Sequence, residues 1–247
     1  MKSIYQKEIG YSPLSCVDLE KMKCQIKICR ELIDGYYKAQ PQDKILVAGT
    51  GEGDEAALLF NEFKVLTVGI DLNIKFSGFK ASQGGFFLQM QDLSSLAFSD
   101  NSFSFIYCYH VLEHVNDPKA VLKELHRVLK PEGILFIGFP NKHRLIAYTG
   151  TSQKTTLKEK IIWNINDYRF RMKGKFENKY GAHAGFTENE YIQIASTSFH
   201  FTIPVRNQYI LIKYKRFEKL GRLIIMSRLS EFLFPSNYFI CKKEYMA

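Results

Sequence analysis

A glycine-rich turn between two apolar segments limits what this chain can fold into more than any other feature. The turn reads Gly-Thr-Gly-Glu-Gly at 49–53, and the second apolar segment, 65–71, ends on Asp71. A strand, a glycine turn, a helix and a second strand ending on a carboxylate form a βαβ unit suited to a nucleoside. Because glycine lets backbone approach a ligand closely, the pattern predicts a nucleoside cofactor whose ribose hydroxyls bind Asp71. The turn residues expected to contact this cofactor are Gly49, Thr50 and Gly51.

The charges around this turn favour one kind of cofactor. A dinucleotide-binding fingerprint needs a third glycine where this chain has Asp54, because a pyrophosphate crowds the start of the helix. Glu52 and Asp54 also put two negative charges where that pyrophosphate would lie. The turn therefore disfavours NAD and favours a positively charged cofactor such as S-adenosylmethionine, which carries a sulfonium and an ammonium group.

Two further segments extend the predicted cofactor site. Residues 86–90 predict a third strand, after which Asp92 is placed to accept from an adenine amine while Leu93 flanks the base. Residues 105–110 predict a fourth strand. Near its end lies Tyr109, whose ring face suits a sulfonium.

A well-marked helix and a fifth strand follow. Asp117 is the expected N-cap and Pro118 the first helical residue, while Pro131 and Gly133 predict the end of the helix. Residues 134–140 are all apolar or glycine and predict a strand covered on both faces. The apolar face of the helix is made of Val121, Leu122, Leu125, Val128 and Leu129.

Taken together, these motifs resemble the class I S-adenosylmethionine-dependent methyltransferases, specifically the small-molecule branch that includes the ubiquinone and menaquinone methyltransferases. The segments that carry the resemblance are the glycine turn, Asp71, Asp92 with Leu93, and residues 96–103, 112–115 and 127–133. The resemblance covers residues 40–140 and, more loosely, 183–190 and 237–243. It implies a Rossmann-like α/β fold with a mostly parallel seven-stranded sheet, helices on both faces and a final antiparallel strand. Leu72, next to Asp71, joins the predicted cofactor contacts.

Two positions depart from the pattern of that family. An acidic residue is usual two positions before the first glycine, where this chain has Val47, and an aspartate usually starts the fourth strand, where it has Ser104. The first change removes a carboxylate from the methionine end of the cofactor, and Glu52 or Asp54 is a candidate substitute. These departures are the features that favour a binding protein without catalysis.

Length and composition fit a single enzyme domain over residues 1–247, of which 46% are hydrophobic. The expected parts are an N-terminal cap helix at 1–40, a cofactor-binding core at 41–140, a basic helical insertion at 141–182 and C-terminal strands with a helix at 183–247. The N-terminus shows no signal core, and no apolar run is long enough to span a membrane. Five cysteines without a C-x-x-C pair read as reduced thiols. We therefore expect a cytoplasmic protein without a metal site.

The N-terminal segment carries its own helical signal. Apolar residues recur at helical spacing after Asp18, and they are Met22, Ile26, Cys29, Ile33 and Tyr36. The resemblance gives such a helix a place over the active site, and the plainer alternative is a helix that only seals the sheet.

The net charge of +9 is concentrated outside the cofactor core. Residues 141–182 contain ten Lys or Arg against three acidic residues, and residues 206–230 contain seven against one. These basic segments could grip RNA, lie on an anionic membrane through residues 206–234, or form a solvated face over a core helix. We rank a small anionic or lipid-linked acceptor above nucleic acid, because the motifs resemble the small-molecule branch.

Two histidines are the candidate catalytic residues. Methyl transfer from a sulfonium needs an acceptor held in line, and a general base helps when the acceptor carries a proton. His110, after the fourth strand, and His183, before a late helix, would both face the cleft at the carboxyl ends of the strands. His114 reads as structural or cleft-lining. The sequence thus predicts a small-molecule methyltransferase, with an RNA methyltransferase or an inactive binding protein as alternatives and a nicotinamide enzyme as a weaker one.

Overall fold

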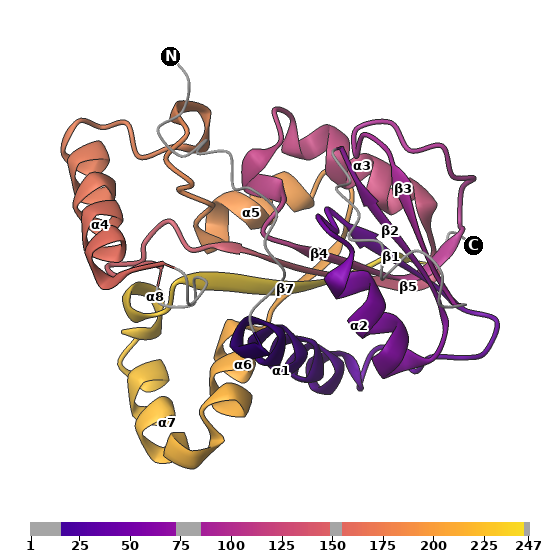
Figure 1. Cartoon of the computed structure of the whole chain (residues 1–247), viewed down its shortest axis with the longest axis horizontal. Coiled ribbons are helices and arrows are strands. Elements are labelled where there is room, and N and C mark those ends of the chain that lie inside the picture. The colour runs from indigo at the N-terminus through magenta and orange to yellow at the C-terminus, as the bar shows by residue number, and fades with distance from the viewer. Residues whose placement is uncertain (1–15, 73–84, 149–154, 245–247) are drawn as a thin grey trace.

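Seven strands form one sheet within residues 16–72, 85–148 and 155–244, which the computed structural model describes (Figure 1). The strand order is β3-β2-β1-β4-β5-β7-β6, in which β1 to β5 are parallel and β7 runs antiparallel to β5 and β6. The fold confirms the predicted mostly parallel sheet with a final antiparallel strand. The strands are β1 (Lys44–Ala48), β2 (Leu66–Asp71), β3 (Phe86–Met90), β4 (Phe103–Tyr109), β5 (Leu129–Pro140), β6 (Phe201–Pro204) and β7 (Ser236–Lys242).

Helices cover both faces of the sheet (Figure 1). Successive residues of a strand point to opposite faces, so Ile45 and Val47 pack with α1, α2 and α6, whereas Leu46 and Ala48 pack with α3 and α5. Burial on both faces explains why the strands read as continuous apolar runs. In the described residues the helices are α1 (Cys16–Ile33), α2 (Asp54–Phe63), α3 (Pro118–Val128), α4 (Leu157–Met172), α5 (Glu188–Ala195), α6 (Arg206–Lys213), α7 (Glu218–Met226) and α8 (Ser230–Leu233), with single turns η1 (Leu112–His114), η2 (Asn178–Tyr180) and η3 (Lys215–Phe217).

The start of α3 is as predicted. The Asp117 carboxylate accepts from the backbone N–H groups of Lys119 and Ala120 at 3.0 and 3.1 Å, and Pro118 occupies the first turn. These bonds satisfy donors that have no partner inside the helix. A cap is a local interaction, which is why the sequence revealed it.

The end of α3 and the start of β5 differ from the prediction. The sequence placed the helix end at 131–133 and the strand at 134–140, whereas α3 ends at Val128 and β5 begins at Leu129. Leu129 is fully buried and pairs with Phe103, which likewise starts β4 two residues before the predicted strand. The burial of Leu129 and its pairing with Phe103 therefore place it in β5, although its spacing matches the apolar face of α3.

Helix α1 seals one face of the sheet. Ile26, Cys29 and Ile33 are buried in the core shared with α2 and α6. The predicted apolar face was wrong at Tyr36, because α1 ends at Ile33 and the Tyr36 side chain is 44% exposed. Of the predicted cap region 1–40, residues 1–15 lie outside the described part of the chain, as do residues 149–154 of the predicted insertion.

Ser104, the second departure from the family pattern, lies far from the glycine turn. Its hydroxyl donates to Asp43 Oδ1, next to the start of β1, and accepts from Lys130 Nζ at 3.1 Å. Lys130 Nζ is also 3.8 Å from Asp43 Oδ1. Where the family usually has an aspartate, this chain thus has a serine that contacts the Asp43 carboxylate together with Lys130. This contact lies at the end of the strands opposite the turn.

Three helices, α4, α7 and α8, lie outside the layers that cover the sheet, along one side of the molecule (Figure 1). Helices α4 and α7 belong to the two basic segments identified in the sequence, and α8 follows the second. None of the helices in the described ranges is long and apolar enough to cross a membrane.

Candidate active site

The glycine turn after β1 has the geometry that its residues predict. Gly49, Gly51 and Gly53 have φ angles of 78°, 53° and 87°, in the left-handed region that favours glycine. A Cβ on Gly49 would lie 2.2 Å from Cγ2 of Val111, so any other residue here would force the Val111 side chain or the turn to shift. A Cβ on Gly51 would meet no atom within 4 Å. The turn therefore presents backbone to open space at Gly51 while packing closely on the segment after β4.

Asp71 ends β2 beside this turn, as predicted. Its Oδ2 accepts from the backbone N–H of Gly51 at 2.9 Å. Leu72 follows with its side chain 60% exposed, at the same edge of the sheet. The Thr50 side chain is buried, and a Cβ on Gly69 would lie 2.8 Å from its Oγ1. The Thr50 backbone is also engaged, because its N–H donates to the carbonyl oxygen of Ile70 and its carbonyl oxygen accepts from Gly53, both at 2.9 Å. A contact of Thr50 with the cofactor therefore stays a prediction.

Asp92 and Leu93 lie on the loop after β3, and they differ in exposure. Asp92 is exposed, and its Oδ1 accepts from the backbone N–H and the hydroxyl of Ser94 at 2.8 and 2.7 Å. The backbone hydrogen bond from Ser94 is the main reason why the pKa of Asp92 lies below its ordinary value. Leu93 is buried in the core that contains α3 and α5. Leu93 thus anchors the loop that presents the Asp92 carboxylate.

These groups fit a nucleoside with a positively charged end. Since β1, β2 and β3 are neighbours in the sheet, the turn, Asp71 and Asp92 follow one another along the carboxyl edge. Open space over Gly51 leaves room for a ligand, and carboxylates with backbone groups suit ribose hydroxyls, an exocyclic amine and a cation. Val47, the other departure from the family pattern, is fully buried and faces the core away from this space.

His110 is held by a buried carboxylate at the end of β4. Its Nδ1 lies 3.0 Å from Oε1 of Glu113, whose side chain is 1% exposed, while the His110 side chain is 37% exposed. In a neutral imidazole this contact places the proton on Nδ1 and leaves the lone pair on Nε2. His110 also has φ 54°, a strained conformation for a residue with a Cβ. The backbone and Glu113 together fix an imidazole that can accept a proton.

Two more histidines gather around the same carboxylate. His114 Nε2 is 3.9 Å from Oε1 of Glu113, and the His114 and His183 rings are 4.7 Å apart and nearly perpendicular. His183 has φ 44°. Burial, followed by the neighbouring His114, lowers the pKa of His183 below its ordinary value. The structure therefore brings both predicted catalytic histidines, His110 and His183, to one cluster, with His114 between Glu113 and His183.

Tyr109 takes part in core packing. A Cβ on Gly138 would lie 2.7 Å from its ring, and the ring runs nearly parallel to that of Tyr238 at 6.2 Å between centroids. Tyr238 in turn stacks on Tyr209 at 3.9 Å. Burial raises the pKa of Tyr109 well above its ordinary value. Its contact with a sulfonium stays a prediction.

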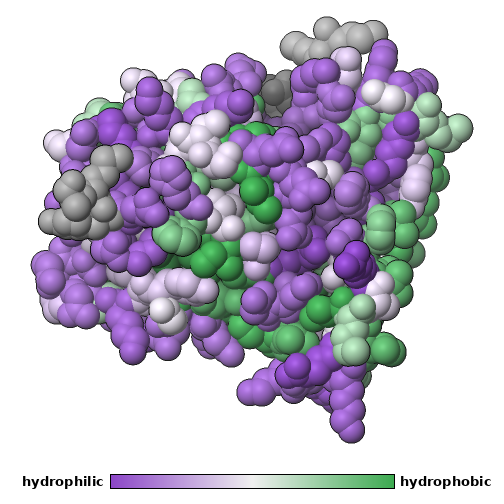
Figure 2. Space-filling view, turned by 180° about the vertical axis from the view of Figure 1, so that it is seen from behind, coloured by the Kyte–Doolittle hydropathy of each residue, from purple (hydrophilic) through white to green (hydrophobic). Residues whose placement is uncertain are grey.

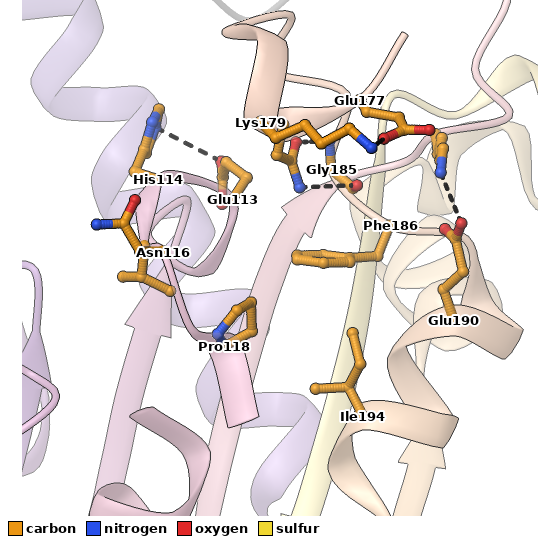
Figure 3. Close-up of a pocket in the computed structure, with 13 residues that line it drawn as sticks. Glu113, His114, Asn116, Pro118, Glu177, Lys179, Gly185, Phe186, Glu190 and Ile194 are labelled. Carbon is orange, nitrogen blue, oxygen red and sulfur yellow. Dashed lines mark hydrogen bonds and ion pairs between the residues drawn. The ribbon is translucent and has the colours of Figure 1, made fainter. Parts of the chain in front are cut away.

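A pocket of about 510 Å³ adjoins the histidine cluster (Figure 3). Figure 3 shows Glu113, His114 and Asn116 on one side and the Phe186 ring pointing into the space from the other. Two ion pairs lie on its rim, Glu177 with Lys179 at 2.7 Å and Lys142 with Glu190 at 2.6 Å. The pocket therefore combines an apolar floor with a charged rim and shares two residues with the histidine cluster.

Sequence reasoning missed the residues that position this cluster. Arg144 and Asp167 form a buried ion pair at 3.0 Å, and Arg144 also donates to the carbonyl oxygens of His183 and Ala184 at 3.0 and 2.9 Å. From the sequence, Arg144 and Asp167 were predicted to belong to the basic segment at 141–182 and not to a buried pair. For Glu113, the spacing of three residues from His110 was the available signal.

No group of three or more His, Cys, Asp or Glu side chains in the described residues is arranged to hold a metal ion.

The fold and site define a Rossmann-like α/β protein with a nucleoside-binding edge. Residues 46–137 match the family model described as "Methyltransferase domain", which confirms the resemblance to the class I S-adenosylmethionine-dependent methyltransferases. The chain is 28% identical to phosphoethanolamine N-methyltransferase 1 of Arabidopsis thaliana, over 40% of this chain and 21% of the relative. It is 35% identical to a ubiquinone/menaquinone biosynthesis C-methyltransferase of Desulfotalea psychrophila, over 36% of this chain and 38% of the relative. The chain thus spans less than half of the length of these curated relatives.

A solved structure shares the fold. Phosphoethanolamine N-methyltransferase 2 of Haemonchus contortus, in complex with S-adenosyl-L-methionine, superposes with a TM-score of 0.57 at 15% identity. The match covers 89% of this chain and 52% of that chain. The likeness therefore extends well beyond residues 46–137.

Proposed function

We propose that this protein transfers a methyl group from S-adenosylmethionine to a small acceptor. The observation that carries the proposal is the close packing of Gly49 on Val111. It sets the turn of a methyltransferase domain directly against the segment that holds His110 and Glu113. Cofactor groups and a polarised imidazole thus meet at one edge of the sheet.

Each group at that edge has a role in the proposal. Bound S-adenosylmethionine supplies a methyl group on a sulfonium, which is already a good leaving group. Asp71 accepts hydrogen bonds from the ribose hydroxyls, and Asp92 accepts one from the adenine amine. The backbone around Gly51 holds the methionine end. His110 takes the proton of the acceptor on Nε2, and Glu113 stabilises the imidazolium formed. His183, kept neutral by burial, is the second candidate base.

The acceptor in this proposal is small and anionic or lipid-linked. The pocket beside His114 is of the size that holds a small molecule, and Lys142 and Lys179 stand on its rim, each paired with a glutamate that an anion would displace. Matched relatives are named for phosphoethanolamine and for ubiquinone or menaquinone biosynthesis. Both names describe small acceptors, one with a phosphate and the other built on a lipid-soluble quinone.

The test is transfer of labelled methyl from S-adenosylmethionine into a native cell extract that is then separated into RNA, protein, lipid and small-molecule fractions. Label in the lipid or small-molecule fraction is expected. Nuclease-sensitive label would instead identify an RNA methyltransferase. Calorimetric binding of S-adenosylmethionine without transfer to any fraction would identify a binding protein, and selective binding of NAD would identify a nicotinamide enzyme.

The roles of the two histidines are separated by single substitutions. His110→Ala is expected to lower kcat about 100-fold or more, as loss of a general base does, while the affinity for S-adenosylmethionine stays within a factor of two or so. The same loss in His183→Ala, with His110→Ala active, would move the base to His183. His200→Ala is the matched control, because His200 is exposed and stands apart from the cluster.

A further inference from the structure

Helix α4 carries an apolar stripe that faces outward. Its exposed apolar residues include Leu157, Ile161, Ile165, Tyr168 and Met172. Their spacing of three or four residues puts them on one side of the helix. The buried side is formed around Asp167, which pairs with Arg144. Helix α4 is thus attached to the protein by Phe170 and Trp163 as well as by the Asp167 pair, and it presents a second apolar side outward.

Helices α7 and α8 repeat this arrangement. Leu220, Leu223 and Met226 of α7 are exposed at successive intervals of three residues, and Phe232 and Leu233 of α8 are exposed as well. The side of α7 toward the protein includes the buried Gly221. Both basic segments therefore contain a helix whose apolar side faces away from the core.

We use the name α4–α7 face for the exposed apolar residues of α4, α7, α8 and the turn at 145–146, which are neighbouring elements on one side of the molecule. The Tyr168 hydroxyl donates to the carbonyl oxygen of Leu145 at 2.7 Å, which joins α4 to the turn. The Leu145 N–H donates to the carbonyl oxygen of Phe232 at 2.8 Å, which joins the turn to α8. Figure 2, which views the molecule from behind, shows apolar residues gathered along the edge where Figure 1 places these helices.

Cations border the apolar side chains. On α4, Lys158 and Arg169 follow the stripe on one flank. On α7, Lys219 lies among the exposed leucines together with Arg222, which pairs with Glu218, and Lys215 lies just before the helix. All of these cations are exposed. The α4–α7 face is therefore both apolar and basic.

We propose that the α4–α7 face docks on an anionic lipid bilayer. Aliphatic side chains enter the boundary between headgroups and acyl chains, and the bordering Lys and Arg side chains contact the anionic headgroups. A symmetric pair of copies would bring the same cations against each other, which costs free energy. RNA contacts proteins through phosphates and stacked bases. A row of Leu, Ile and Met side chains offers neither a positive charge for a phosphate nor an aromatic ring for a base. The positive charge and the aliphatic side chains of the α4–α7 face therefore favour an anionic membrane over a second copy of the chain or RNA.

The experiment is sedimentation of the full chain with vesicles. One set contains phosphatidylcholine alone, and the other contains roughly one third phosphatidylglycerol, a strongly anionic surface. Binding is expected to the anionic set only and to weaken as salt rises, because salt screens the headgroup charge. Neutralising Lys158, Arg169, Lys215 and Lys219 with glutamine is expected to weaken binding about fivefold for each charge removed.

The apolar part is tested by charged substitutions on each helix. Ile161→Glu with Ile165→Glu on α4, and Leu223→Glu with Met226→Glu on α7, are each expected to lower vesicle binding at least tenfold or so, because a carboxylate resists burial in the acyl boundary. The matched controls are Phe87→Glu, an exposed apolar residue of β3, and Lys119→Gln with Lys123→Gln on α3. Because the replaced side chains are exposed, unchanged circular dichroism is expected.

Three results would overturn the proposal. Tighter binding to a single-stranded RNA than to anionic vesicles would make the surface a nucleic-acid site. A dimer in analytical ultracentrifugation that dissociates in the Ile161→Glu and Ile165→Glu variant, without vesicle binding, would make it an interface between copies. A monomer that ignores both vesicle sets would make it a solvated face. Each of these results stands whether or not the protein proves to be a methyltransferase.

Discussion

At the scale of single residues, the site depends on carboxylates that are held by neighbours. Glu113 is buried and fixes His110, and Asp71 accepts from Gly51 at the turn. Glu113 therefore acts on a side chain of this protein, and Asp71 acts on its backbone in addition to the ribose contact proposed for it. A substitution must separate these two effects, so charge removal at constant shape is more informative than truncation.

Asp71→Asn is expected to weaken binding of S-adenosylmethionine by about 1–3 kcal/mol, because an amide oxygen can still accept from Gly51 but the charge-assisted bonds to ribose are lost. Isothermal titration calorimetry measures the change. Asp34→Asn, an exposed position outside the site, is the control. Unchanged affinity in Asp71→Asn would refute the ribose assignment.

Glu55, in the first turn of α2, gives the protein a pH-dependent stability. Burial raises its pKa from 4.5 to about 8, and its carboxyl lies beside Tyr107. Between these two values the folded protein holds a proton that the unfolded chain releases. The free energy of unfolding is therefore expected to fall as pH rises through this window, by at most about 1.4 kcal/mol per pH unit.

Glu55→Gln is expected to remove this component, because the amide does not titrate. Urea unfolding between about pH 5 and pH 8 measures the slope. Glu31→Gln, an exposed residue of α1, is expected to keep the slope of the parent protein. An identical slope in Glu55→Gln would show that other groups set the pH dependence.

At the scale of elements, the contact between the glycine turn and the segment after β4 holds the proposed cofactor and acceptor sites together. Gly49→Ala adds a methyl group 2.2 Å from Val111 and forces φ 78° on a residue with a Cβ. We expect it to lower the free energy of unfolding by about 2–4 kcal/mol. Gly51→Ala has a positive φ but open space, so it is expected to lose only about 1–2 kcal/mol.

A double-mutant cycle assigns the difference to packing. Val111→Ala removes the colliding methyl groups, so the pair Gly49→Ala with Val111→Ala is expected to recover at least about 0.5 kcal/mol relative to the sum of the single changes. Urea unfolding of the four proteins gives the coupling. Strict additivity would mean that backbone strain alone makes Gly49 necessary.

At the scale of the whole molecule, the buried pair Arg144–Asp167 attaches the α4 segment to the end of the sheet. Arg144→Met leaves the Asp167 carboxylate buried without its cation, and it also removes the bonds to the His183 and Ala184 carbonyl oxygens. We expect a loss of about 3–5 kcal/mol in the free energy of unfolding, because burial already disfavours the charged carboxylate. Urea unfolding measures it.

Arg222→Met is the matched control, since Arg222 and Glu218 form an exposed pair within α7. It is expected to change the free energy of unfolding by no more than about 1 kcal/mol. Adding Asp167→Leu to Arg144→Met is expected to restore part of the loss, because an apolar side chain needs no partner. Equal effects of Arg144→Met and Arg222→Met would contradict a structural role for the buried pair.

Most of the fold could be predicted from the sequence, but the site could be predicted only in part. The cap at Asp117, the turn at 49–53 and the end of β2 at Asp71 were correct, because they depend on interactions within a few residues. Leu129 was assigned to the wrong element, because its pairing with Phe103 across the sheet outweighs local helical spacing. The prediction for Tyr36 was wrong because its spacing continues the apolar pattern of α1, whereas the helix itself ends at Ile33.

The sequence by itself determined the order of the elements from β1 to β5, the left-handed glycine turn and the carboxylates that follow neighbouring strands. Positive φ angles, alternation along a strand and helix caps depend on residues close together in the chain, so the local sequence is enough to predict them. The tertiary structure alone decided that His110 and His114 lie beside the buried Glu113 carboxylate with His183 against His114, that Arg144 pairs with Asp167, and that the apolar sides of α4 and α7 face outward. Each of these features depends on contacts between residues far apart in the chain, and on which side chains those contacts bury.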